Sequence, residues 1–456
     1  MSPAKKKKRH LGTYFTVGVA VLLALYVYFI EKPDRLPKNA ISMYNVETED
    51  IRKVEVINLQ TNESLTLEKQ GKDWRMVKPK LYEIEKSDVE GLVNNLADLR
   101  IERKVRENCT DLVPYGLEKP AHRISFTAGK KTQEVLVGNK NPTQVSYYIK
   151  EGSKNDVYTA FAYSVEYLIK DVKALRKKNL FDLETDKVTG VTIKLDKKEI
   201  VLVKDASNNW IIEPYKFAAE KTTVIDLIEK LKNLRVADYF EDEPATLVKY
   251  GIERPRVSVI VSRGAGLDPV SLFVGKKVKD KEEDYVKSSD GLAVYSVDKS
   301  FAAGFDKTYN DYRDRKIFNF KASDISGVLI EKDGKKLANA IKDRFGKFKI
   351  EEPVSKLADV QFVDLLNYAS TLSAEKFVDD SGKRFEKYGL KSPAVSITFF
   401  EQTGNEKKIK AKLMLGRLEK NEYNVRIEGN DTVFAVSRTI ADKLAVIDNF
   451  VKEKTK

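Results

Sequence analysis

The sequence contains almost no cysteine or histidine. Its 456 residues include one cysteine, Cys109, and two histidines, His10 and His122. A lone cysteine excludes a disulfide within the chain, so each domain must be stable through its hydrophobic core. The sequence also has too few His and Cys side chains to build a zinc site, although a calcium site made only of carboxylates stays open. We therefore predict neither a bound metal nor a cofactor.

The sequence also lacks the short motifs of common enzymes. It has no Gly-x-Ser-x-Gly turn, no His-Glu-x-x-His helix, no Gly-x-x-x-x-Gly-Lys phosphate loop and no Gly-x-Gly-x-x-Gly. Carboxylates for acid–base chemistry are present in Asp379-Asp380 and Glu282-Glu283-Asp284, but we interpret these as solvated loops. We predict no catalytic residue. A carboxylate-based hydrolase is the alternative, and it would use acidic residues that occur in only one part of the chain.

Charge is absent from residues 11–30, which follow the basic cluster Lys5–Arg9. A helix of this length spans the hydrocarbon core of a bilayer. A cleaved signal peptide would have a shorter apolar region and a small-x-small cleavage site, whereas here Tyr28, Phe29 and Ile30 lead into a charged residue. We predict an uncleaved transmembrane helix at 11–30. The positive-inside rule makes residues 1–10 a cytoplasmic tail and places the bulk of the chain outside the cytoplasm.

The remaining charge is mixed rather than clustered. The formal net charge is +13, of which +5 falls in residues 1–32 and +8 in the rest. Interspersed lysines of this kind are typical of solvated faces, so we predict no nucleic-acid partner. Weak attraction to anionic headgroups or cell-wall polymers is compatible with this balance.

One turn occurs three times, as Tyr-Gly-Leu-Glu-Lys-Pro, Tyr-Gly-Ile-Glu-Arg-Pro and Tyr-Gly-Leu-Lys-Ser-Pro, beginning at Tyr115, Tyr250 and Tyr388. An apolar residue three positions before each Tyr indicates a short helix with both side chains on one face. The Gly is typical of a C-cap in the left-handed region, and the Pro cannot continue a helix. Three such turns predict three homologous domains.

Matching positions set the period of the repeat. Tyr44, Phe181 and Phe318 are spaced by 137 residues. We predict a linker at 31–40, repeat domains at 41–178, 179–315 and 316–450, and a tail at 451–456. This period is too long for a solenoid unit of about 20–50 residues, so each copy should be a domain.

Each copy has an α+β pattern, which predicts mostly antiparallel sheets with packed helices. In the first copy, alternating segments near 54–57 and 65–67 and a Trp strand at 74–79 precede an amphipathic helix, for which Ser87 and Glu90 have capping-box spacing. Four more strands and a closing helix near 163–169 follow the Tyr-Gly turn. His122 corresponds to Val residues in the other copies, which indicates a strand face.

The repeated residues have two interpretations. The aromatic side chains could line a ligand groove, but we favour a role in the core of each copy, where they hold a sheet against its helix. The residues of this structural repeat motif are Trp74, Tyr115, Gly116, Pro120, Trp210, Tyr250, Gly251, Pro255, Phe348, Tyr388, Gly389 and Pro393.

The order of these motifs resembles the bacterial domain of unknown function 4340. The resemblance rests on the Trp strand, the amphipathic helix, the Tyr-Gly-Leu-x-x-Pro turn, a Leu-Val-Gly strand end, paired Tyr strands and a closing Leu-Arg-x-Lys segment, and it covers nearly all of 41–450 in three copies. The third copy departs from it, with Phe348 for Trp and no basic join at its end. Members of that family are single-pass envelope proteins whose genes often lie near ABC-type transport systems, including those of gliding motility, and no enzymatic activity is established for them.

The resemblance implies a protein of the bacterial inner membrane with a periplasmic body. We expect a non-catalytic binding or scaffold component, accessory to an ABC-type transporter, with membrane lipid and transporter subunits as partners. An alternative is a rod that binds envelope polysaccharide or cell wall through its basic surface. The sequence names no small-molecule ligand.

Overall fold

The computed structural model describes residues 41–264, 266–352, 359–404 and 406–437. The predicted tail 1–10, transmembrane helix 11–30, linker 31–40 and C-terminal residues 438–456 lie outside these ranges. Within them, no helix combines the length and the hydrophobicity that a membrane crossing requires.

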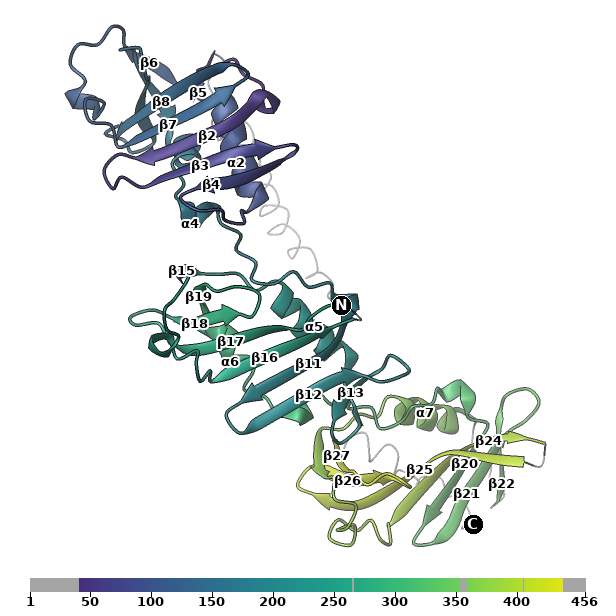
Figure 1. Ribbon diagram of the computed structural model, residues 1–456. Helices are drawn as coiled ribbons and strands as arrows, with labels where there is room; N and C mark the ends of the chain where they lie inside the picture. The colour runs from purple at the N-terminus through teal and green to yellow at the C-terminus, as the bar shows by residue number, and fades with distance from the viewer. Residues whose placement is uncertain (1–40, 265, 353–358, 405, 438–456) are drawn as a thin grey trace, which may run out of the picture. The chain divides into compact units, whose positions relative to one another are not determined.

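Three large antiparallel sheets share one strand order (Figure 1). Each begins with a meander, continues through a helix into a short edge strand, and ends with a four-stranded meander. The first strands of the two meanders pair in the middle of the sheet, and the short strand pairs with the last strand. This order confirms the predicted mostly antiparallel α+β fold. A further two-stranded sheet pairs β1 (Ile41–Ser42) with β5 (Arg100–Ile101).

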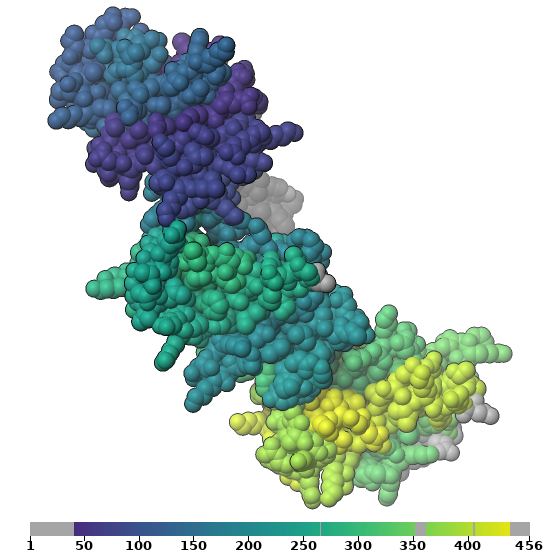
Figure 2. Space-filling model, in the orientation of Figure 1, coloured from purple at the N-terminus to yellow at the C-terminus, as the bar shows by residue number. Residues whose placement is uncertain are grey.

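The three sheets are built from consecutive parts of the chain, so each forms a body of neighbouring colours in the space-filling view (Figure 2). The strands of the first are β2 (Ile51–Asn58), β3 (Ser64–Gln70), β4 (Asp73–Lys78), β6 (Arg103–Arg106), β7 (His122–Ala128), β8 (Lys131–Lys140), β9 (Ser146–Glu151) and β10 (Val157–Phe161). The strands of the second are β11 (Val188–Leu195), β12 (Lys198–Lys204), β13 (Trp210–Glu213), β14 (Phe217–Ala218), β15 (Asp238–Glu241), β16 (Val257–Arg263), β17 (Val270–Lys277), β18 (Glu283–Ser288) and β19 (Val294–Asp298). The strands of the third are β20 (Gly327–Lys332), β21 (Lys335–Lys342), β22 (Phe348–Glu352), β23 (Lys376–Asp379), β24 (Val395–Thr403), β25 (Glu406–Glu419), β26 (Glu422–Ile427) and β27 (Val433–Ser437).

One helix in each copy connects the first meander to the short strand. These helices are α2 (Lys86–Ala97), α5 (Lys221–Lys232) and α7 (Asp359–Ser370). The apolar face predicted for α2 is confirmed, but the capping box is wrong. The helix begins at Lys86 and its N-cap residue, Glu85, makes no side-chain bond, so Ser87 lies inside the first turn. The predicted closing helix is α3 (Ala162–Leu168), which the short α4 (Val172–Leu175) and, in the second copy, α6 (Lys299–Ala303) accompany as minor helices.

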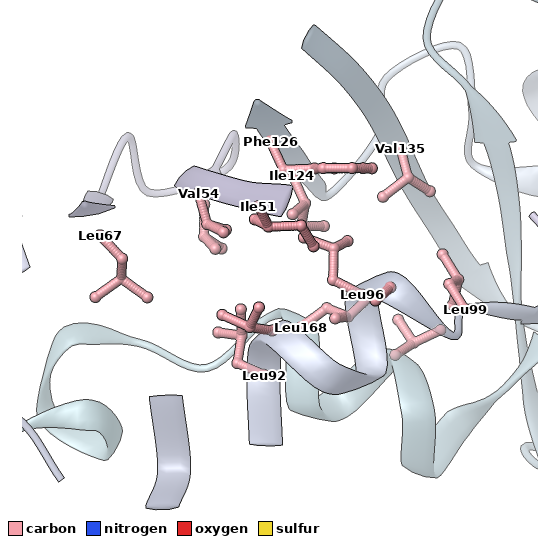
Figure 3. Packing of buried hydrophobic residues seen from close by; sticks show 14 of the residues in the cluster. Ile51, Val54, Leu67, Leu92, Leu96, Leu99, Ile124, Phe126, Val135 and Leu168 are labelled. Carbon is pink, nitrogen blue, oxygen red and sulfur yellow. The ribbon is translucent and has the colours of Figure 1, made fainter. Parts of the chain in front are cut away.

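The core of the first copy lies between the sheet and α2 (Figure 3). Leu92 and Leu96 project from the helix toward Ile51, Ile124 and Phe126 from the strands, and all five are at most 1% exposed. Alternating buried residues on β7 and the three-to-four spacing of α2 bring these faces together. The periodicity of the sequence therefore determines this layer directly.

The Tyr-Gly turn and the Val-Gly strand end form one packed unit in every copy. The turns contain short 3-10 helices at Val113–Tyr115 and Val248–Tyr250, followed by glycines with φ of 67° and 69°. A Cβ built on Gly138, Gly275 or Gly416 would lie 2.2, 2.1 or 2.1 Å from the carbonyl oxygen of the repeated Tyr. The turn therefore packs its backbone directly on the strand end, which explains why both motifs recur together.

Contacts along the chain divide the described residues into two compact units. The first holds the residues up to Asp182 with Asn233–Glu243 and Ala293–Val297, and the second holds Leu183–Lys232, Pro244–Leu292 and those from Asp298 onward. The sites below each lie within one unit.

Candidate functional site

An arginine at the end of the first copy binds aromatic and acidic side chains within the first unit. Arg176 follows α4, and its Nη1 lies 2.8 Å from Oδ1 of Asp242, next to β15. The guanidinium carbon is 4.1 Å from the ring centre of Tyr82 and 4.2 Å from that of Tyr239. The Tyr82 hydroxyl also donates to Asp242 over 2.5 Å, and the Tyr239 hydroxyl donates to the Lys177 carbonyl over 2.7 Å. The two rings and the carboxylate thus hold the guanidinium on three sides.

The electrostatics of this group favour the charged pair. Burial by itself would raise the pKa of Asp242, but the hydrogen bonds from Tyr82 and Arg176 outweigh it and hold that pKa below its ordinary value. Burial raises the pKa of Tyr239 to about 12, so its hydroxyl stays protonated and remains a donor. Arg176 and Asp242 are therefore both ionised at neutral pH.

A cavity of about 500 Å³ opens beside this arginine, within the first unit. Besides Arg176 and its partners, it is lined by Asn58, Ser64, His122, Lys170 and Lys173. Lys170 pairs with Asp88 over 2.8 Å and Lys173 with Asp238 over 2.7 Å. Burial lowers the pKa of His122, so its imidazole is neutral at pH 7, and its buried Nδ1 has no hydrogen-bond partner among the described residues.

The arrangement of the cavity suits binding better than chemistry. Ser64 and His122 both line it, but no hydrogen bond joins them in the described structure, so a nucleophile and a base are not assembled. The described residues also contain no group of three or more His, Cys, Asp or Glu side chains that would hold a metal ion. The prediction for His122 needs a refinement: the residue lies on β7, and its side chain contributes to this cavity.

The same arginine arrangement recurs at the end of the second copy, within the second unit. Arg313 lies 137 residues after Arg176 and is 5% exposed. Its Nη1 lies 3.0 and 2.9 Å from the two carboxylate oxygens of Asp380, and its Nη2 donates to Thr432 over 3.2 Å. The guanidinium carbon is 3.6 Å from the ring centre of Phe217 and 3.8 Å from that of Phe377. The repeated basic joins thus supply an arginine that a following acidic strand receives.

A comparison with known protein families matches most of the chain. The family described as Domain of unknown function (DUF4340) matches residues 74–212, 210–353 and 349–455. The chain belongs to the DUF4340 family. The three matches confirm the predicted tandem copies. No curated protein and no solved structure matches the chain.

The DUF4340 matches begin at the repeated aromatic strand rather than at the start of a sheet. Trp74 is half-buried against the first core, whereas Trp210 and Phe348 are 5% and 4% exposed. Trp210 also lines a second cavity of about 680 Å³ with Lys204, Lys221 and Glu229. The repeated Tyr residues pack at the turns, where Tyr115 and Tyr250 meet Tyr148 and Tyr285 edge to face.

The acidic pairs are not the solvated loops that the sequence suggested. Asp379 ends β23 and is 7% exposed, and Asp380 pairs with Arg313. Asp284 lies on β18, is 1% exposed and forms an ion pair with Arg256. The interpretation was wrong because the burying partners come from distant parts of the chain, which local composition does not reveal.

Asp379 gives the third copy a specific acid sensitivity. Hydrogen bonds from Ser381, with further ones from Arg384 and Tyr388, outweigh burial and lower its pKa from 3.8 to about 2. A lowered folded-state pKa contributes stability above the unfolded value and loses it as pH falls toward the folded value. We expect hydrogen exchange in β23 and β27 to accelerate between about pH 4 and pH 2. Asp379→Asn should start less protected and lose that acid-dependent component; parallel acceleration in both proteins would contradict the assignment.

A third repeated feature was missed by sequence reasoning. Lys150 donates to the carbonyls of Glu151, Gly152 and Lys154, and Lys287, 137 residues later, donates to those of Ser288 and Gly291. Burial lowers the pKa of both lysines. Each closes the turn after its strand. The equal spacing was the available signal, but lysines in a basic protein attract no attention as core residues.

Proposed function

We propose that this DUF4340 protein is a membrane-tethered, extracytoplasmic binding component of the bacterial envelope, that it is accessory to an ABC-type transport system, and that it acts without catalysis. The observation that carries the non-catalytic part is how the repeated residues are used. The Tyr-Gly turns pack on strand-end glycines, and the join arginines bind an aromatic residue and an aspartate. What the copies share is architecture, and function depends on sites rather than on a fold.

The membrane and transporter parts of the proposal have separate supports. The uncharged run at 11–30 behind Lys5–Arg9 supports the tether and its orientation. The family resemblance supports the transporter. The cavity beside Arg176 supports binding, since it combines aromatic faces with charged groups of both signs.

Crosslinking in native membranes tests the proposal. Tagged full-length protein is crosslinked in intact cells, isolated under denaturing conditions and identified with its partners by mass spectrometry. We expect crosslinks from lysines of 41–437 to extracytoplasmic loops of a transporter permease. A matched control carries a cleavable signal peptide in place of 1–30, which exports the body without the tether and should lose most of these crosslinks.

The alternative outcomes are specific. Reproducible recovery of wall or surface polymer with no transporter subunit would overturn the accessory role and favour a polymer-binding rod. Binding of that kind rests on exposed charge and should weaken as salt is raised.

A further inference from the structure

The short strand β6 of the first copy occupies the position that receives the arginine in the later copies. In β15 the receiving residues are Tyr239 and Asp242, and in β23 they are Phe377 and Asp380. All three strands pair with the last strand of their sheet and share a register shift at the same place. The shared register aligns Lys104 with Tyr239 and Phe377.

The receiving chemistry is replaced by positive charge in β6. The strand reads Arg103-Lys104-Val105-Arg106, with both arginines and Lys104 exposed. Register places Arg106 where the later copies have Glu241 and Asp379. No repeat domain precedes the first copy in this sequence, so no join arginine arrives here, and a second basic side chain would be repelled.

Two of these charges have no counterion within the described structure. Lys104 lies 3.0 Å from Asp156 and 3.4 Å from Glu107, so its charge is largely compensated. Arg103 and Arg106 take part in no ion pair among the described residues. Their free guanidinium groups are suited to phosphate oxygens, which they bind through paired hydrogen bonds.

The place where the chain enters the first copy lies next to this strand. β1 begins at Ile41, which pairs with Ile101 of β5, and β6 starts two residues after Ile101 (Figure 1). Only residues 31–40 separate Ile41 from the predicted membrane span, and ten extended residues reach at most about 35 Å. The sequence connection therefore restricts β6 to the neighbourhood of the bilayer surface.

We infer that β6 is a contact surface for anionic lipid headgroups, through Arg103 and Arg106. The inference rests on the proposed membrane tether. Anionic headgroups supply the phosphate that unpaired arginines bind, and each basic side chain near such a surface strengthens attraction about fivefold. The contact orients the first copy on the membrane, while the cavity beside Arg176 belongs to a different part of the unit.

The test uses the native cysteine as a reporter. Cys109 follows β6 closely in the chain and is partly exposed. Full-length protein carrying a fluorophore on Cys109 is reconstituted into vesicles of phosphatidylcholine alone, or of phosphatidylcholine and phosphatidylglycerol in equal parts, each with a quencher on a headgroup. We expect stronger quenching in the phosphatidylglycerol vesicles, and we expect added salt to remove the difference.

Paired variants separate charge from folding. Arg103→Gln with Arg106→Gln should abolish the phosphatidylglycerol-dependent quenching, whereas Arg103→Lys with Arg106→Lys should retain most of it. Lys130→Gln with Lys131→Gln, on the β7–β8 hairpin that β9 and β10 separate from β6, should behave as the unmodified chain.

Two outcomes would overturn the inference in distinguishable ways. If alkaline carbonate extracts the chain from the vesicles, the tether fails, and the proposed function fails with it. If the chain is retained but quenching is equal in both lipids, or is unchanged in the glutamine variant, only the lipid contact of β6 is wrong.

Discussion

Gly275→Ala is expected to unfold the second copy. The added Cβ would lie 2.1 Å from the carbonyl oxygen of Tyr250 and 3.0 Å from Cγ1 of Ile252. The first neighbour is backbone held by the Tyr-Gly turn, so neither side can yield without separating the turn from the sheet. Overpacking of this kind costs about 3 kcal/mol or more. Hydrogen exchange of the full-length protein, followed in peptides of β16, β17 and β18, measures the effect.

Matched variants test the reason for this effect. Gly264→Ala lies in the same copy, and its nearest neighbour would be 3.6 Å away, an ordinary contact, so exchange should stay unchanged. Gly138→Ala and Gly416→Ala should move the loss of protection to the first and third copies. Equal protection in Gly275→Ala and Gly264→Ala would show that the turn does not pack on the strand end as described.

Asp380→Asn is expected to be the most damaging single change at a join. It would leave Arg313 charged, 5% exposed and without its carboxylate. Removing one partner of a buried ion pair costs about 3–5 kcal/mol. Urea unfolding of the full-length protein, followed through the third copy by pulsed hydrogen exchange, measures this loss. Asp306→Asn makes the same charge change at an exposed position nearby and should be silent.

Two further variants separate the parts of the Arg313 arrangement. Arg313→Lys keeps the charge but gives up the stacking on Phe217 and Phe377, so we expect an intermediate loss. Arg313→Met combined with Asp380→Leu removes both charges and should recover much of the stability, because an apolar pair carries no desolvation penalty. A double variant as unstable as Asp380→Asn alone would contradict the ion-pair explanation.

Local patterns predicted the elements of the fold, and distant contacts escaped them. The buried face of α2 follows from the spacing of Val89, Leu92 and Leu96, and the positive φ of Gly116 follows from the Tyr-Gly turn. The capping box failed because the same Ser-x-x-Glu spacing occurs one turn position too late.

The candidate site depends on pairs that no local pattern connects. Tyr82 and Asp242 are 160 residues apart, and Arg313 and Asp380 are 67 residues apart. The joins were recognised as basic, but a sequence of one protein does not show which acid receives which arginine. The cavity beside Arg176 was missed for the same reason, since its lining comes from four separate segments of the chain.

The location of the first copy relative to the membrane is the central claim, and Cys109 allows a direct test. In spheroplasts that express the full-length chain, a membrane-impermeant maleimide is added before or after lysis. We predict that Cys109 is labelled in intact spheroplasts, whereas Ser2→Cys in a Cys109→Ser background is labelled only after lysis. Labelling of Ser2→Cys in intact spheroplasts, with Cys109 protected until lysis, would contradict the orientation and with it the extracytoplasmic binding role.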